Sequence, residues 1–133
     1  MKAAVIEEPG KLVVREVPEP AMGDYDCLCE GLYGTTCSGT DLHLLGGHPL
    51  FGIKFPTILG HESIGRVIEV GPKVECFKVG DLVTRLCNRP TENLRVHWGG
   101  FAERGLVSDW RAMERDGVPL DWTKGIQQVL PTD

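Results

Sequence analysis

The chain has 133 residues, which is close to the usual size of a single domain. Its net charge of -5 and its scattered Lys and Arg residues argue against nucleic acid or an anionic membrane as a partner, because both require clustered positive charge. No apolar run approaches the roughly 18 to 20 residues that span a bilayer, and the N-terminus lacks a secretory signal pattern, so we expect a cytoplasmic protein.

The first elements in chain order are predicted to be short strands. Residues 2–7 and 11–16 flank Glu8-Pro9-Gly10, which is the pattern of a β-hairpin with a short turn. Residues 26–33 predict another strand, residues 40–45 a brief helical turn, and residues 46–56 a loop whose apolar side chains could line a pocket.

The cysteines do not form a recognisable metal-binding knuckle. Cys27 and Cys29 would share one face of their strand, and a spacing of two does not match the Cys-x-x-Cys zinc knuckle. We therefore predict that both are buried apolar thiols. The five cysteines are an odd number without the dense spacing of a secreted disulfide scaffold, so reduced thiols are expected.

The middle of the chain continues the β pattern. Residues 64–70 are rich in β-branched side chains and end at Gly71-Pro72, residues 81–86 predict the next strand, residues 88–100 a polar loop, and residues 101–107 a further strand. The 17 Gly and 9 Pro fit many turns between short strands. Together these elements predict a small, barrel-like β domain.

The last segment is predicted to be helical. Ser108 is expected to cap a two-turn helix that stops at Gly117. Asp121 is expected to cap a second helix ended by Pro131, because four apolar residues fall at the spacing of one helix face. These residues are Trp122, Ile126, Val129 and Leu130.

Two segments carry the residue types of a catalytic zinc site. One runs from Cys37 to His43 and contains a thiol, hydroxyls, a carboxylate and an imidazole; the other begins with Gly60-His61-Glu62. Catalytic zinc usually has three protein ligands drawn from Cys, His and carboxylates, and a fourth position for water or substrate. Cys37, His61 and Glu62 fit that set, although their separation in the chain makes this a weak signal on its own.

Further motifs strengthen the signal. Gly60-His61-Glu62-x-x-Gly65 followed by Gly71-x-x-Val74 resembles the signature of zinc-containing alcohol dehydrogenases of the medium-chain dehydrogenase/reductase superfamily. Thr40-Asp41-x-His43, the run from Val74 to Val83 and Gly99-Gly100-Phe101-Ala102-Glu103 resemble the same family in its usual order. This resemblance covers about residues 1–107. It implies a mainly β fold, a GroES-like partly open β-barrel with a few short helices, to which we add residues 108–133 as a helical extension.

The resemblance also implies roles for the site residues. Cys37 and His61 would bind one catalytic zinc ion, with Glu62 as a ligand or an exchangeable neighbour. Thr40 would exchange the substrate hydroxyl proton and His43 would relay it to solvent.

Asp41 would accept a hydrogen bond from the His61 ring nitrogen that faces away from zinc and so fix the tautomer. Thr40 and Asp41 also fit a simpler alternative, in which they cap the following helical turn.

The sequence departs from the family pattern in two places. Three residues rather than two separate Cys37 from Asp41, so either a bulge at Gly39 lets Cys37 reach the metal, which we favour, or Ser38 takes the usual ligand position. The lobe with four closely spaced cysteines that binds structural zinc in many relatives is also absent. We therefore interpret four residues as structural or surface groups: Cys76, Cys87, His48 and His97.

These features imply an oxidoreductase, the catalytic domain of a zinc-dependent alcohol or polyol dehydrogenase that would transfer hydride between an alcohol or carbonyl substrate and NAD or NADP. Residues 1–133 contain no Gly-x-Gly-x-x-Gly turn of a Rossmann domain, so we expect truncation before that partner domain, NAD(P) binding only in the complete enzyme, and no turnover by the chain alone. A homo-oligomer is compatible with the family.

Two alternatives remain open. A zinc-independent quinone or enoyl reductase domain would share the fold and place Ser38 in the pocket with Cys37 turned into the core. A free-standing GroES-like binding module would have no enzymatic role.

Overall fold

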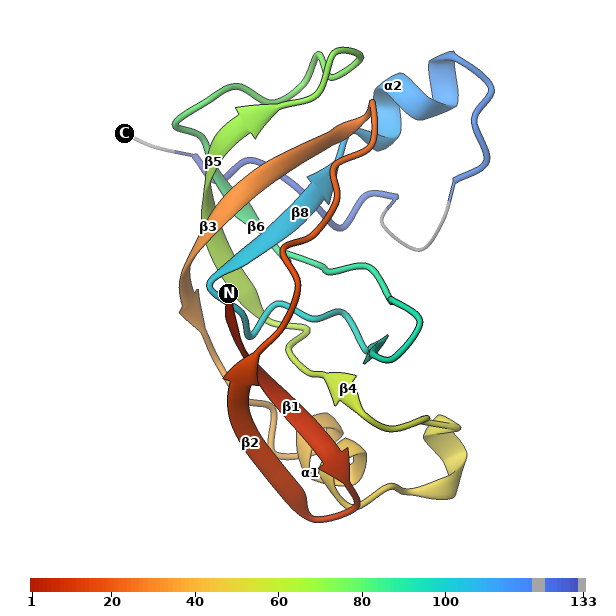
Figure 1. Cartoon of the computed structure of the whole chain (residues 1–133). Coiled ribbons are helices and arrows are strands. Elements are labelled where there is room, and N and C mark those ends of the chain that lie inside the picture. The colour runs from red at the N-terminus through yellow and green to blue at the C-terminus, as the bar shows by residue number, and fades with distance from the viewer. Residues whose placement is uncertain (121–123, 132–133) are drawn as a thin grey trace.

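The computed structural model describes residues 1–120 and 124–131 and contains two four-stranded sheets (Figure 1). The first has the order β2-β1-β4-β7, formed by β2 (Lys11–Glu16), β1 (Lys2–Glu8), β4 (Thr57–Ile58) and β7 (Arg95–Val96). The second has the order β6-β5-β3-β8, formed by β6 (Leu82–Thr84), β5 (Ser63–Val70), β3 (Asp26–Gly34) and β8 (Arg104–Ser108). The helical elements are α1 (Thr40–Leu45), the 3₁₀ turn η1 (Pro49–Phe51) and α2 (Trp110–Arg115).

The predicted mainly β, GroES-like fold is confirmed. β1 and β2 form the expected antiparallel hairpin, and β3 pairs with β5 and β8 on its two sides. The sheets form a partly open barrel, and the strands of the described residues do not close into a complete one. Within those residues, no helix is both long and apolar enough to cross a membrane.

Buried thiols lie at the centre of the second sheet. Cys27 and Cys29 are fully buried and pack with Val67, Val83 and Val107, as their alternation on one face predicts. Burial raises the pKa of Cys27 to about 12 and raises the pKa of Cys29 further, so neither is a thiolate at neutral pH. None of the five cysteines, all of which lie within the described residues, forms a disulfide there.

The connection that carries His61 is fixed by close backbone packing. Gly60 has a φ of 111°, and a Cβ atom at this position would lie 2.4 Å from the Phe101 nitrogen. Two backbone hydrogen bonds hold the same place, from Gly100 to the Gly60 carbonyl and from Phe101 to the Leu59 carbonyl. Only glycine fits here, because the backbone is left-handed and another chain segment occupies the side-chain position.

The predicted cap of α2 is off by one residue. Asp109, not Ser108, caps the helix, and its carboxylate accepts a hydrogen bond from the Ala112 nitrogen at 3.1 Å. Ser108 ends β8 instead, and its hydroxyl donates to Asp26 at 2.7 Å. Gly117 follows the helix with a φ of 70°, as a stop signal should.

The second C-terminal helix was predicted wrongly over the described part. Residues 124–131 form turns and an extended stretch that pairs with β6, through bonds from Thr84 to the Gln128 carbonyl and from Leu130 to the Leu82 carbonyl. Asp121 and Trp122 lie outside the described residues. The apolar spacing suggested a helix, but the open edge of β6 offers backbone partners that the sequence pattern does not show.

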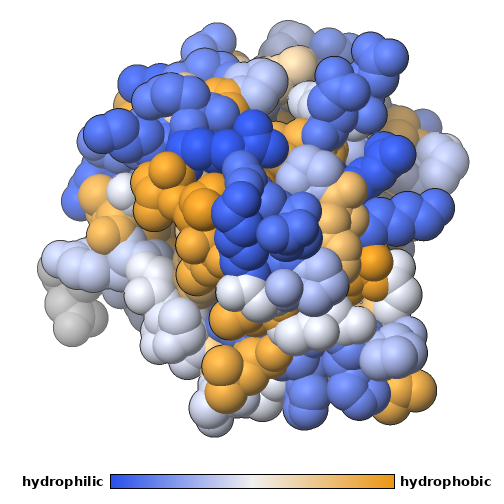
Figure 2. Space-filling view, turned by 60° about the horizontal axis from the view of Figure 1, so that its bottom comes forward, coloured by the Kyte–Doolittle hydropathy of each residue, from blue (hydrophilic) through white to orange (hydrophobic). Residues whose placement is uncertain are grey.

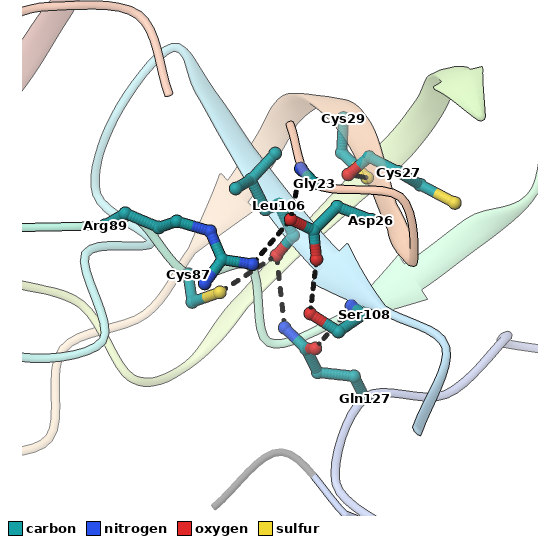
Figure 3. A network of polar contacts seen from close by, with 9 residues as sticks. All are labelled: Gly23, Asp26, Cys27, Cys29, Cys87, Arg89, Leu106, Ser108 and Gln127. Atoms are coloured by element: carbon teal, nitrogen blue, oxygen red, sulfur yellow. Dashed lines mark hydrogen bonds and ion pairs between the residues drawn. The ribbon is translucent and has the colours of Figure 1, made fainter. Parts of the chain in front are cut away.

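Gln127 explains why this segment docks where it does (Figure 3). Its side chain is fully buried, accepts from the Ser108 nitrogen at 2.8 Å, and donates to the carbonyls of Arg85 at 2.7 Å and Leu106 at 3.1 Å. The last described segment is thereby tied into the second sheet. The domain boundary placed at residue 107 stays a prediction.

Candidate functional site

The segment after β3 folds back on itself around Asp41. The Cys37 nitrogen donates to Asp41 Oδ2 at 2.8 Å, and the Asp41 nitrogen donates to the Cys37 carbonyl at 3.0 Å. α1 begins at Thr40, with Gly39 as an N-cap that makes no side-chain bond. Neither Thr40 nor Asp41 therefore caps this turn with its side chain; Asp41 lies in the first turn of α1 and holds the backbone of Cys37 instead.

The other oxygen of Asp41 faces His61. Asp41 Oδ1 lies 3.2 Å from His61 Nδ1, and both side chains are largely buried. The two atoms are within ion-pair distance but are not aligned as a hydrogen bond, and neither has another hydrogen-bond partner among the described residues. One carboxylate thus joins the Cys37 segment to His61, and a carboxylate beside a ring nitrogen is the usual setting of a metal-ligating histidine.

Cys37 is half-buried and chemically distinct from the core thiols. The backbone N–H groups of Thr40 and Gly39, together with the Thr40 hydroxyl, lower the pKa of Cys37, against opposing effects of burial and the Glu62 charge. A lowered pKa favours the thiolate, which is the form that binds metals. Among the predicted site residues, Thr40 therefore lies next to Cys37.

His43 lies in the same short helix as Thr40 and makes a different set of contacts. It is exposed, its ring stacks on Phe51 with centroids 5.9 Å apart, and it meets the edge of His48 at 5.1 Å. His48 is also exposed, and its Nδ1 accepts a hydrogen bond from the Leu50 nitrogen at 3.3 Å. The ring contacts of His43 are thus with His48 and Phe51.

Glu62 faces a separate hollow. It lines a cavity of about 390 Å³ together with Tyr33, Arg85 and neighbouring residues. Across residues 1–120 and 124–131, no three His, Cys, Asp or Glu side chains converge in a metal-binding arrangement. The chemistry of His61 with Asp41, and of the activated Cys37 thiol, fits zinc, whereas a third donor is not assembled with them.

A second cavity adjoins Cys37. It measures about 370 Å³ and lies between β2, α1 and the segments that precede β5 and β8. Its lining residues are Leu12, Thr36, Cys37, Ser38, Asp41, Leu42, Leu45, Leu59 and Phe101. Both Cys37 and Ser38 line it, so Cys37 is not turned into the core. Figure 2 brings this end of the molecule forward and shows apolar surface between hydrophilic groups.

His97 was interpreted as structural or surface, but it lies close to the site. Burial and the His61 charge lower the pKa of His97, while Asp41 acts in the opposite direction. The cause is topological: β4 and β7 pair in parallel, and the His97 nitrogen donates to the Ile58 carbonyl at 2.9 Å. Residues just after the two strands therefore meet, a proximity that two-residue strands do not reveal in the sequence.

Comparisons with known proteins identify sequences that are similar to this chain. Residues 31–119 match the family model of the alcohol dehydrogenase GroES-like domain. The NADP-dependent isopropanol dehydrogenase of Clostridium beijerinckii is 33% identical over 121 residues, covering 89% of this chain and 34% of that protein. L-threonine 3-dehydrogenase of Streptomyces avermitilis is 43% identical over 88 residues, covering 63% of this chain and 25% of that protein.

A solved structure is also similar to this chain. 2R,3R-butanediol dehydrogenase from Bacillus subtilis matches with a TM-score of 0.63 and 27% identity, covering 81% of this chain and 38% of that one. In each of these cases the chain spans less than two fifths of the relative's length.

Proposed function

The chain belongs to the alcohol dehydrogenase GroES-like domain family, and we propose that it is the substrate- and zinc-binding catalytic domain of an alcohol or polyol dehydrogenase. The complete enzyme would transfer hydride between an alcohol and NAD or NADP, with the dinucleotide bound by a Rossmann domain outside this chain. The chain alone would not turn over substrate.

The observation that carries this proposal is the position of Asp41 between Cys37 and His61. Asp41 binds the backbone of Cys37 through one oxygen and lies 3.2 Å from His61 Nδ1 with the other. This leaves His61 Nε2 as the nitrogen that can bind a metal, in the tautomer that a carboxylate at Nδ1 selects. A buried carboxylate in a purely structural role would not need to link these two residue types.

Zinc would be held by Cys37 and His61, with Glu62 as the third donor once its side chain turns toward them. Bound there, zinc supplies Lewis-acid chemistry to the oxygen of an alcohol or carbonyl. The thiolate form of Cys37 is favoured by its surrounding N–H groups. The Thr40 hydroxyl beside it would exchange the substrate proton, and the exposed His43 would pass that proton to solvent.

Elemental analysis of the chain purified without chelators tests the proposal. We expect one zinc per chain, lost in His61→Ala and in Cys37→Ala and retained in His48→Ala, which removes an exposed imidazole outside the proposed ligand set. NADP should not bind to any of the four proteins. A zinc-free chain, or full zinc retention in His61→Ala, would sink the proposal.

One observation favours a second candidate, the zinc-independent reductase domain. Ser38 lines the cavity beside Cys37, which is half of what that alternative requires. That alternative also requires Cys37 to be turned into the core, and this requirement is not met, because Cys37 lines the cavity. A homo-oligomer and a cytoplasmic location stay predictions.

A further inference from the structure

We propose that the cavity between β2 and α1 binds the body of the substrate, and that this substrate is a small alcohol, or the matching carbonyl compound, with an apolar body. Polyols and amino acids would be poor ligands. Identifying the ligand as the substrate rests on the proposed function, whereas the affinity of the cavity for apolar alcohols can be tested separately.

The position of the cavity links it to the candidate site. Cys37 and Asp41 form part of its wall, and the rest of the wall comes from β2, α1 and the residues around Leu59 and Phe101. A ligand inside would therefore have one end beside the Cys37 thiol. Its volume of about 370 Å³ lies within the range of small-molecule sites.

Most of the cavity lining is apolar. Five large apolar residues form it: Leu12, Leu42, Leu45, Leu59 and Phe101. Among the residues that the structure describes, no Lys or Arg lines the cavity, so a substrate carboxylate would find no cation from them there.

The polar groups of the cavity come from the segment around Cys37. Asp41 is already engaged with the Cys37 nitrogen and faces His61, which leaves the hydroxyls of Thr36 and Ser38 as its other polar side chains. These lie next to Cys37 in the chain. One hydroxyl or carbonyl beside them can be satisfied, but further hydroxyls along a polyol would be buried without partners, which weakens binding.

The cavity beside Glu62 gives a contrasting environment. It has a similar volume, and its lining includes the charged residues Glu62 and Arg85 and the hydroxyl residues Thr35 and Thr84, beside apolar surface from Tyr33 and Ile64. A polyol or a charged substrate would find partners there. Binding of sorbitol that is lost in Arg85→Ala would therefore place the substrate in that cavity and overturn the proposal.

The probes are cyclohexanol, a series of straight-chain alcohols from ethanol to hexanol, and sorbitol, each titrated into the full chain with NMR detection of methyl and amide shifts. We expect saturable binding of cyclohexanol with shifts centred on Leu12, Leu42 and Leu45. Each added methylene should tighten the Kd about three- to fourfold until the cavity is full. Sorbitol should give no saturable shifts.

Two pairs of variants locate the binding site. Leu12→Asp and Leu42→Glu place a charge in the wall at positions that are 50% and 63% exposed, so folding should tolerate them. Val14→Asp and Leu50→Glu are matched controls on β2 and near α1 that are 72% and 89% exposed and lie outside the lining. The first pair should weaken cyclohexanol binding at least about tenfold, and the controls should leave it unchanged.

The outcomes separate this inference from the proposed function. No saturable cyclohexanol binding, or equal weakening by the control variants, overturns the inference even if the chain holds zinc. A zinc-free chain that still binds cyclohexanol, with the expected loss in Leu12→Asp, supports the apolar cavity and contradicts the zinc-dependent function.

Discussion

Asp41 is the residue on which the candidate site depends most. Its two carboxylate oxygens point to different segments, one to the Cys37 backbone and one to His61 Nδ1. Replacing Asp41 by an uncharged side chain of the same shape should therefore weaken metal binding more than it destabilises the fold.

We predict that Asp41→Asn weakens zinc binding about 10- to 100-fold, because an amide cannot hold the His61 tautomer as a carboxylate does. A competition titration with a chromophoric chelator measures this. Asp81→Asn is the control, since that carboxylate accepts a bond from the Lys78 nitrogen away from the site. Equal zinc affinity in Asp41→Asn and the wild-type chain would show that Asp41 only holds the Cys37 backbone.

A second carboxylate stabilises the fold rather than the site. Asp109 is 1% exposed and accepts bonds from the nitrogens of Glu75, Cys76 and Ala112. Burial raises its pKa, but these N–H groups outweigh it and the pKa is lowered overall. A carboxyl whose folded-state pKa is depressed stabilises the protein above its unfolded pKa, and this contribution is lost as the pH falls through the folded value.

Asp109→Asn should therefore reduce the free energy of unfolding by about 1–3 kcal/mol at neutral pH. The gap from the wild-type chain should shrink as the pH falls below about 4, where the wild-type carboxyl begins to protonate. Urea unfolding at a series of pH values measures both effects. A gap that does not vary with pH would contradict the assignment of a charged, hydrogen-bonded Asp109.

At the scale of elements, the connection between β4 and β5 sets the position of His61. Gly60 and Gly80 both have positive φ values, 111° and 95°. A Cβ atom at Gly60 would clash with the Phe101 backbone nitrogen, whereas a Cβ atom at Gly80 would meet no neighbouring atom. Alanine should cost about 1–3 kcal/mol of backbone strain at Gly80.

At Gly60 alanine should cost at least about 2 kcal/mol more, because the Phe101 backbone must move. Thermal unfolding of Gly60→Ala and Gly80→Ala separates strain from clash. Zinc binding should fall in Gly60→Ala alone. Similar unfolding free energies for the two variants would mean that the Phe101 segment yields easily and does not fix His61.

The pairing of residues 124–131 with β6 depends on Gln127. Gln127→Leu would leave the Ser108 nitrogen and the Arg85 carbonyl without their bonds to this side chain, and we expect a loss of about 2–4 kcal/mol. The neighbouring Gln128→Leu removes an exposed amide of the same size and should change the stability by less than about 0.5 kcal/mol. Equal losses in denaturant unfolding would show that burial of Gln127 contributes no specific stability.

At the scale of the whole molecule, the sequence predicted those strands and turns that local residue patterns determine. Strand alternation located β1, β2, β3 and β5, and glycine and proline signals located the turns between them. β4 and β7 could not be predicted because each has only two residues and is defined by pairing with remote strands, β4 with β1 and β7, and β7 with β4. The prediction of the second C-terminal helix was wrong for a related reason. The edge of β6, with which this segment pairs instead of forming a helix, is distant in the sequence.

The site shows the same division. Asp41 lies beside His61 as the resemblance to the family implies, and its proposed role in orienting that ring stays to be tested. The approach of His97 and the separate cavities beside Cys37 and Glu62 could not be predicted, because they arise from contacts between segments that are remote in the chain. Residue types in the sequence indicate which side chains could bind a metal, whereas only the folded structure shows which of them lie close together.

The central claim is that this chain holds zinc through Cys37 and His61. X-ray absorption at the zinc edge, on the chain loaded with one equivalent of zinc, tests it most directly. We predict one sulfur scatterer at about 2.3 Å and at least one imidazole at about 2.0–2.1 Å, with the sulfur lost in Cys37→Ser and retained in Cys76→Ser. A zinc shell without sulfur, or a sulfur contribution that survives Cys37→Ser, would contradict the account.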